Sequence, residues 1–167
     1  MTDTARILLR TAALAFLPVS ELRGAIPFAC ANGLPWYAAL PFAAAVNALA
    51  APACWLFLST LHKMLYGKGG RGGLRCYRGL FDRFVSRARR KLESRIDRWG
   101  WFGLALFVAV PLPVTGAWTG TLGAWVLGMR RGRALLAVLL GVLLAGIIVT
   151  AVTVLGLEAL RIFVKRA

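Results

Sequence analysis

Four long apolar segments fill most of this 167-residue chain, at about residues 7–33, 34–59, 99–128 and 134–157. The second and fourth segments each hold the roughly 20 apolar residues that a helix needs to cross a bilayer. Hydrophobic residues make up 59% of the chain and the mean hydropathy is +0.71, which is too apolar for a soluble domain of this length. The sequence therefore predicts an all-α integral membrane protein.

The first and third segments are interrupted near their centres by "LPVSELRG" and "PLPVTGAWTG". About ten helical residues precede each break, and ten residues rise only about 15 Å, half the hydrocarbon thickness. Irregular backbone at that depth survives only inside protein or beside a wet cavity. We expect each broken segment to be a re-entrant helical hairpin, with two full crossings as the alternative. The residues expected to break the helices are Pro18, Gly24, Pro27, Pro111, Pro113, Gly116 and Gly120.

The two breaks align with each other at an offset of 95 residues. Residues 17–20 (LPVS) match residues 112–115 (LPVT), and the same offset brings Gly33 onto Gly128 without a gap. This predicts an internal repeat in one membrane domain, 1–167, with copies at 7–59 and 99–157. Re-entrant hairpins would make the copies inverted, one re-entrant hairpin plus one transmembrane helix each, whereas full crossings would make them parallel.

A basic linker, residues 60–98, joins the two copies. From Lys63 to Arg98 it holds twelve Lys or Arg residues against three acids, and apolar residues recur in it at helical spacing. This pattern predicts an amphipathic helix that binds anionic lipid headgroups, and the excess of positive charge places residues 62–98 in the cytoplasm. An anchoring role is the simpler interpretation, and a gating or partner-binding role is the alternative. We expect no nucleic-acid partner, because the charge gathers in one loop between membrane segments.

Two charges in the first break, Glu21 and Arg23, are the main candidates for a functional site. In the simpler interpretation they form a salt bridge that stabilises an awkward turn. In the functional interpretation Glu21 carries a proton, while Arg23 binds an anionic group through its bidentate fork. The further expected lining residues are Ser20, Asn47, Thr115, Trp118 and Thr119.

Simpler roles compete for these lining residues too. Ser20 and Thr115 are placed to cap the returning half-helices, whose N-termini would then converge and favour an anion. Asn47 lies in the middle of a span, where an amide is more often a hydrogen-bonding contact between helices than a substrate ligand.

The sequence offers little support for a metal, a cofactor or enzymatic catalysis. The three cysteines and the one histidine lack metal-binding spacing, and no nucleophile–base pair is present. Stripes of small residues at a spacing of four permit close helix packing. Together with hairpins that need covering, they predict a homodimer or a larger homo-oligomer.

The stretches "PVSELRGAIPFACANGLP" and "VPLPVTGAWTGTLGAWVLG" resemble the small multidrug export protein family, a distant relative of the DedA/VTT membrane proteins. The resemblance runs from about Leu14 to Leu157. It implies a re-entrant inverted-repeat fold in the bacterial inner membrane and a transporter-like role. DedA-type relatives look like flippases or scramblases for lipids, including undecaprenyl phosphate, and their acidic and arginine residues suggest proton coupling. The second break has no arginine, so the DedA arginine pair has no counterpart here.

These observations lead to one main functional hypothesis, a small multi-pass membrane transporter that moves an anionic lipid or amphiphile with proton coupling. A membrane organiser that binds anionic lipids without transporting them, and a small-drug exporter, are the alternatives.

Overall fold

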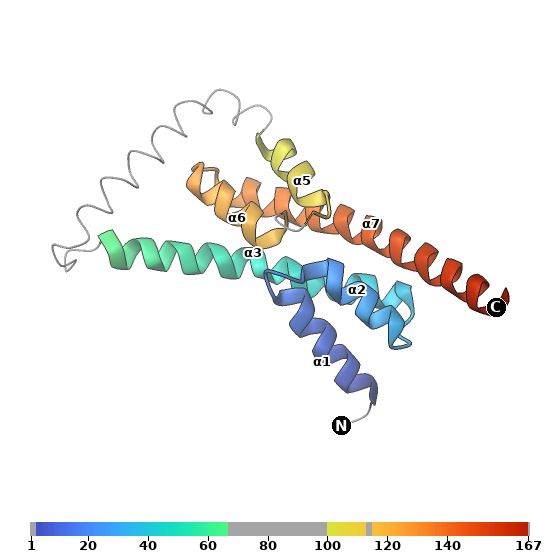
Figure 1. Cartoon of the computed structure of the whole chain (residues 1–167). Coiled ribbons are helices and arrows are strands. Elements are labelled where there is room, and N and C mark those ends of the chain that lie inside the picture. Colours follow the sequence, from blue (N-terminus) through green and yellow to red (C-terminus); the bar gives the residue numbers. More distant parts are fainter. Residues whose placement is uncertain (1–2, 67–99, 113–114, 167) are drawn as a thin grey trace.

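The computed structural model describes residues 3–66, 100–112 and 115–166, and these residues form helices and no strand (Figure 1). The helices are α1 (Asp3–Phe16), α2 (Glu21–Ala31), α3 (Trp36–Tyr66), α5 (Trp101–Ala109), α6 (Ala117–Val126) and α7 (Arg131–Arg166). Two of them, α3 and α7, are long and apolar enough to cross a membrane. The predicted all-helical class is therefore confirmed.

Both segments expected to be broken consist of two short helices with a bend between them. The first bend covers residues 17–20 between α1 and α2, and the second covers residues 110–116 between α5 and α6. Pro18 lies in the first bend, and Pro111 and Gly116 lie in the second, while Pro113 falls outside the described residues.

Three of the expected helix breakers are instead helical, so their assignment to the bends was wrong. Gly24 and Pro27 lie inside α2, and Gly120 lies inside α6. The two glycines have packing roles. A Cβ at Gly24 would lie 2.1 Å from Ser20 Oγ, and one at Gly120 would lie 2.5 Å from a Val108 methyl carbon. Pro27 is tolerated because packing against neighbouring helices can outweigh one lost backbone hydrogen bond.

Both long helices extend beyond their expected ends. Helix α3 continues from residue 59 to Tyr66, so the first seven residues assigned to the basic linker are part of this helix. Helix α7 begins at Arg131 and reaches Arg166, beyond residue 157. No proline interrupts either extension, so nothing in the sequence stops the helix there. The expected amphipathic helix of the linker lies mostly outside the described residues.

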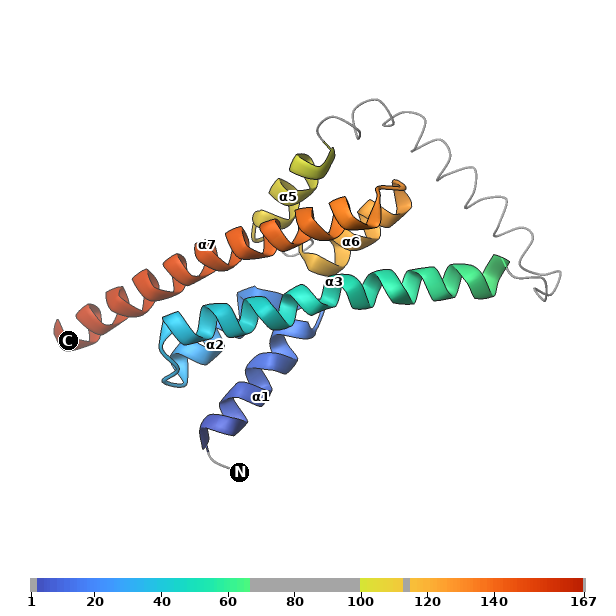
Figure 2. The ribbon, with the colours of Figure 1, turned by 180° about the vertical axis from the view of Figure 1, so that it is seen from behind.

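The helices pack in corresponding pairs in the two halves of the chain. Helices α3 and α7 pack against each other and run in opposite directions (Figures 1 and 2). In the first half α1, α2 and α3 contact one another, as α5, α6 and α7 do in the second half. Each returning helix also packs on the long helix of the other half, α2 on α7 and α6 on α3. The bends therefore meet between the two long helices.

The turns that lead into the two long helices have matching geometry. Gly33 and Gly128, the residues aligned at an offset of 95, both have positive φ, at 90° and 73°. After α2 the Leu34 N–H bonds to the Ala29 carbonyl at 3.0 Å, and after α6 the Met129 N–H bonds to the Ala124 carbonyl at 3.0 Å. This is the Schellman arrangement, in which a left-handed glycine ends a helix.

Small residues allow the helices to approach closely. The α3 stripe, Ala39, Ala43, Asn47 and Ala51, is buried within the chain itself, so it is not free to contact a second copy. On α7, Gly141 lies against α5. A Cβ at Gly141 would lie 2.6 Å from the Val108 Cβ and 2.7 Å from the Ala105 carbonyl oxygen.

Replacing Gly141 with alanine should therefore force α5 and α7 apart. We expect Gly141→Ala to lower the free energy of unfolding by about 1–3 kcal/mol, the usual cost of overpacking. Gly156→Ala is the matched control on the same helix, because a Cβ there meets nothing within 4 Å. Unfolding in detergent micelles, followed by circular dichroism, measures both variants, and equal stabilities would contradict close α5–α7 packing at Gly141.

Candidate functional site

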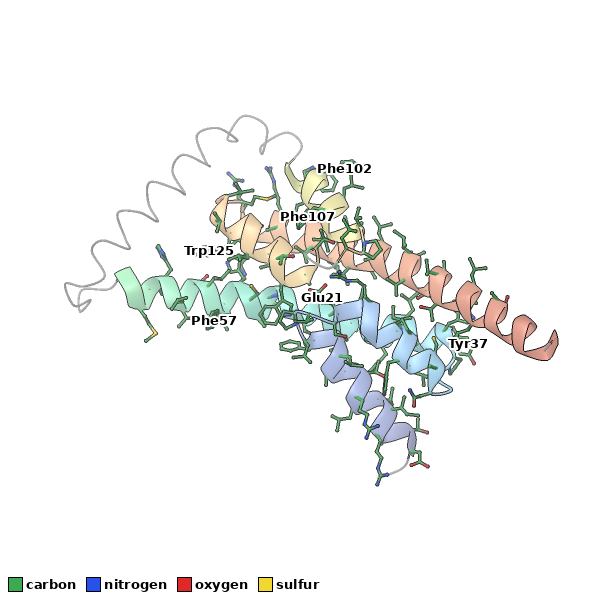
Figure 3. The ribbon with its side chains drawn as sticks, viewed as in Figure 1. Glu21, Tyr37, Phe57, Phe102, Phe107 and Trp125 are labelled. Atoms are coloured by element: carbon green, nitrogen blue, oxygen red, sulfur yellow. The ribbon has the colours of Figure 1, made fainter. Side chains whose placement is uncertain are left out.

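The candidate site is the place where the two bends meet. Figure 3 shows Glu21 at the centre of the molecule, between α2 and α6. Side chains from the start of α2 contact backbone groups of the second bend and of α6, and a side chain from α6 binds the backbone at the end of α1.

The Glu21 carboxylate caps α6, a helix from the other half of the chain. Glu21 is 5% exposed, and its carboxylate lies against the start of α6, where it interacts with the backbone N–H groups of Ala117 and Trp118. These are the first two residues of α6, whose N–H groups have no partner within the helix. A carboxylate also complements the partial positive charge of a helix N-terminus. Glu21 therefore fills the anion-binding position of α6.

The backbone around this cap is adapted to it. Glu21 is the one residue other than glycine with positive φ, at 47°, in the part of the chain that the structure describes. Such a conformation costs about 1–3 kcal/mol and persists only where the surroundings impose it. Gly116, on the facing side, has no room for a side chain, since a Cβ there would lie 1.8 Å from Glu21 Oε2.

Arg23 makes the second contact between the bends. Its Nη2 donates a hydrogen bond to the Thr115 carbonyl oxygen at 2.6 Å and lies 3.6 Å from Glu21 Oε2. The Arg23 side chain is about one-fifth exposed, while that of Glu21 is nearly buried. The expected salt bridge is therefore present; Arg23 also holds the second bend, and Glu21 also holds the start of α6.

Trp118 makes the reverse contact, from α6 to the end of α1. Its Nε1–H donates a hydrogen bond to the Phe16 carbonyl at 2.8 Å. The two rings meet edge to face, with centroids 5.5 Å apart. Phe16 is the last residue of α1, so its carbonyl has no partner within that helix. The helix ends that flank one bend thus satisfy open backbone groups beside the other bend.

The expected capping by Ser20 and Thr115 was wrong. Neither α2 nor α6 has a side-chain cap from its N-cap residue, and the N-cap of α6 is Gly116. The Thr115 hydroxyl instead bonds to the Val110 carbonyl and accepts the Leu112 N–H at 3.1 Å, within its own bend. Glu21 already occupies the α6 N–H groups that Thr115 was expected to satisfy.

A small cavity of about 10 Å³ lies beside the Glu21 cap, large enough for about one water molecule. Its polar lining comes from Glu21, Arg23, Asn47 and Thr115. Asn47, on α3, is 1% exposed, and its Oδ1 has no hydrogen-bond partner. This buried amide therefore faces the meeting point of the bends with one acceptor unused.

The structure brings four of the seven expected site residues to this cavity and places the others around it. Trp118 is in the adjoining contact with Phe16. The Thr119 hydroxyl bonds to the Gly116 carbonyl at 3.4 Å, and Ser20 packs against Gly24, so neither lines the cavity. Sequence reasoning missed the backbone groups of Phe16, Ala117 and Trp118, because a backbone group has no residue-type signal.

The described ranges contain no group of three His, Cys, Asp or Glu side chains that could hold a metal ion.

Comparison with known proteins gave one match. The model of a family described as "Putative small multi-drug export protein" matches residues 21–148, from the Glu21 cap into the middle of α7. No curated protein and no solved structure matches the chain. Since the match covers more than half of the sequence and includes both halves of the candidate site, the chain belongs to the small multi-drug export protein family.

Proposed function

We propose that this membrane protein is an exporter whose closed centre is the contact between its two bends, and that it moves an anionic lipid or amphiphile with proton coupling. The family suggests membrane export. The observation that carries the rest is the pair of contacts from Glu21 and Arg23 to the backbone at residues 115–118. A substrate can pass between the halves only if these contacts open.

The fold supports bends that lie inside the membrane. The 14 residues of α1 rise about 21 Å and the nine of α5 about 14 Å, both short of a hydrocarbon core of about 30 Å. Each bend would then sit at depth, covered by α3 and α7, as irregular membrane backbone requires. The antiparallel long helices and the matching turns at Gly33 and Gly128 favour an inverted repeat.

The chemistry of the contact favours an anionic substrate. The first N–H groups of α6 bind a carboxylate in the closed state, and Arg23 lies within 4 Å of the same carboxylate. A phosphate or carboxylate on a substrate has acceptor oxygens like those of Glu21. It would therefore compete with Glu21 for the α6 N–H groups and for Arg23. Protonation of Glu21 would remove the negative charge from the cap and weaken its hold on α6. In this mechanism the proton opens the centre and the substrate anion occupies it.

Transport in proteoliposomes tests the proposal. The substrate is a fluorescent polyprenyl-phosphate analogue, and the driving force is a pH gradient. We expect wild-type protein to move it in a gradient-dependent way, and Glu21→Gln and Arg23→Ala each to slow transport by at least about tenfold, the effect of losing one charge-assisted contact. Ser59→Ala is the control, because the Ser59 hydroxyl bonds only within α3, to the Trp55 carbonyl.

The outcomes separate the parts of the proposal. Equal rates in all four proteins would make the Glu21–Arg23 pair purely structural and overturn the site. A loss in both variants without any dependence on the gradient would keep the anion site and overturn proton coupling.

A membrane organiser is the second candidate, and the twelve basic residues from Lys63 to Arg98 favour it. On the cytoplasmic side of the bacterial inner membrane these residues would bind anionic headgroups directly. Neutralising residues 87–91 separates the two functions, since an organiser depends on this stretch and an exporter depends on Glu21.

The proposed homo-oligomer would cover the exposed leucines of α7, and crosslinking in bilayers that gave only monomer would overturn it.

A further inference from the structure

A groove separate from the central site opens where the α2–α3 turn meets the last part of α7. It has a volume of about 320 Å³, within the range of small-ligand sites. Cys30 comes from the end of α2, Leu34 and Pro35 from the turn, Trp36 from the start of α3, and Leu157 and Glu158 from α7. Trp36 begins α3, and Glu158 lies one residue from the end of the membrane-compatible part of α7, so the groove lies at one end of the two candidate spans. Figure 3 labels Tyr37, which follows Trp36, at this end.

The other half of the chain explains why the groove is open. At the offset of 95, Cys30 corresponds to Trp125, Leu157 to His62 and Glu158 to Lys63. In that half the Trp125 ring packs edge to face against His62, with centroids 5.5 Å apart. The small Cys30 side chain stands where that half has an indole ring, and an acid stands where it has a base. The groove is therefore a feature of one copy, with space and charge that differ from those of the other.

The lining has the chemistry of a site for an organic cation. Glu158 is exposed, and no ion pair joins it to any side chain that the structure describes. Trp36 is 51% exposed and lies against Tyr37, with ring centroids 5.9 Å apart. A carboxylate beside an accessible indole attracts a cation through charge and through the face of the ring. Leu34, Pro35 and Leu157 supply apolar walls.

We propose that this groove binds an amphiphilic organic cation, a positively charged centre bearing apolar groups, with Glu158 and Trp36 facing the charge. The site does not depend on the proposed central mechanism, because Glu21 and Arg23 do not line the groove. Binding here would place a cation at the membrane boundary, where apolar groups can stay in the lipid while the charge meets Glu158.

Cys30 provides a direct readout, because its half-buried thiol lines the groove. Cys54→Ala and Cys76→Ala leave Cys30 as the one thiol of the chain. The experiment measures how fast N-ethylmaleimide alkylates Cys30 in this variant, held in phosphatidylglycerol nanodiscs. We expect tetraphenylphosphonium to slow the alkylation. Glu158→Gln should raise the tetraphenylphosphonium concentration needed for half-maximal protection by about fivefold, the effect of one exposed charge contact.

Tetraphenylborate is the matched control, because it has nearly the same size and shape with the opposite charge. Equal protection by both ions, or protection by tetraphenylphosphonium that Glu158→Gln leaves unchanged, would overturn the cation site. Binding of tetraphenylphosphonium to the chain with all its cysteines, measured by equilibrium dialysis, provides a test that needs no cysteine substitution. Failure to bind there would also overturn the proposal.

The cation can come from solution or from a lipid headgroup, and nanodiscs of different composition distinguish the two sources. If phosphatidylethanolamine alone slows alkylation in a Glu158-dependent way, the occupant is a lipid ammonium group. If only tetraphenylphosphonium does so, the occupant is a soluble amphiphile. Protection by neither overturns the proposal. None of these outcomes depends on transport, so the failure of the central mechanism and the failure of this site are distinguishable.

Discussion

Replacing Glu21 with alanine should lower the free energy of unfolding by about 3–5 kcal/mol, the range seen when one partner of a buried charge pair is removed. The change leaves the N–H groups of Ala117 and Trp118 without their acceptor and leaves Arg23 without its counter-charge. Neither loss can be made good by water if the bends lie within the membrane. Unfolding in detergent micelles, followed by circular dichroism, measures the effect.

Two companion substitutions make this result specific. Glu21→Gln keeps one carbonyl oxygen as acceptor and should lose about half as much stability, because charge-assisted hydrogen bonds are roughly twice as strong as neutral ones. Asp3→Ala removes a fully solvated carboxylate whose one ion pair, to Arg6, is exposed, and should change stability by less than about 0.5 kcal/mol. If Glu21→Ala were no more harmful than Asp3→Ala, the cap would contribute nothing to the fold.

Gly116→Ala should have the second large effect, a loss of about 2–4 kcal/mol, because the new methyl group would push the Glu21 carboxylate off α6. The added Cβ would lie within 2.4 Å of all three carboxylate atoms. The backbone itself would accept alanine, since Gly116 has extended φ and ψ of 171° and −170°. The whole effect should therefore come from the collision with Glu21. We also expect transport of the polyprenyl-phosphate analogue to fall.

A control in the same helix and a double mutant test this cause. Gly123→Ala adds a methyl group where nothing lies within 4 Å, and should raise stability by about 0.5–1 kcal/mol. In a Glu21→Ala background the obstacle to the Gly116 methyl is gone, so Gly116→Ala should there cost little. Additive losses in the double mutant would contradict a direct contact between the two positions.

The broad arrangement of helices could be predicted from the sequence because it depends on side-chain type. Long apolar runs identify α3 and α7, and prolines beside small polar residues mark both bends. The ends of the individual helices were less predictable. Three residues expected to break helices lie inside them instead: Gly24, Pro27 and Gly120. The two glycines are there because neighbouring side chains leave no room for a Cβ, a reason for glycine that the sequence does not distinguish from a turn.

The partners of the site residues could not be read from the sequence. Glu21 and Arg23 stand out as charges in an apolar segment, but the groups that they bind are backbone atoms at residues 115, 117 and 118. Any residue except proline offers a backbone N–H, so only the packing of the two halves reveals which one is used. The same packing overturned Thr115 as a cap, since a carboxylate from the other half had taken its place.

The contact between the bends also has an order in time. The ribosome completes the first half of the chain, with Glu21 already in place, well before it makes the N–H groups of α6 that this carboxylate binds. During that interval Arg23, two residues further along the chain, can neutralise the Glu21 carboxylate. A nascent first half therefore carries its own temporary counter-ion. In the folded chain the same arginine stays near Glu21 and also donates to the Thr115 carbonyl, so one side chain pairs first within its own half and then also with the second half.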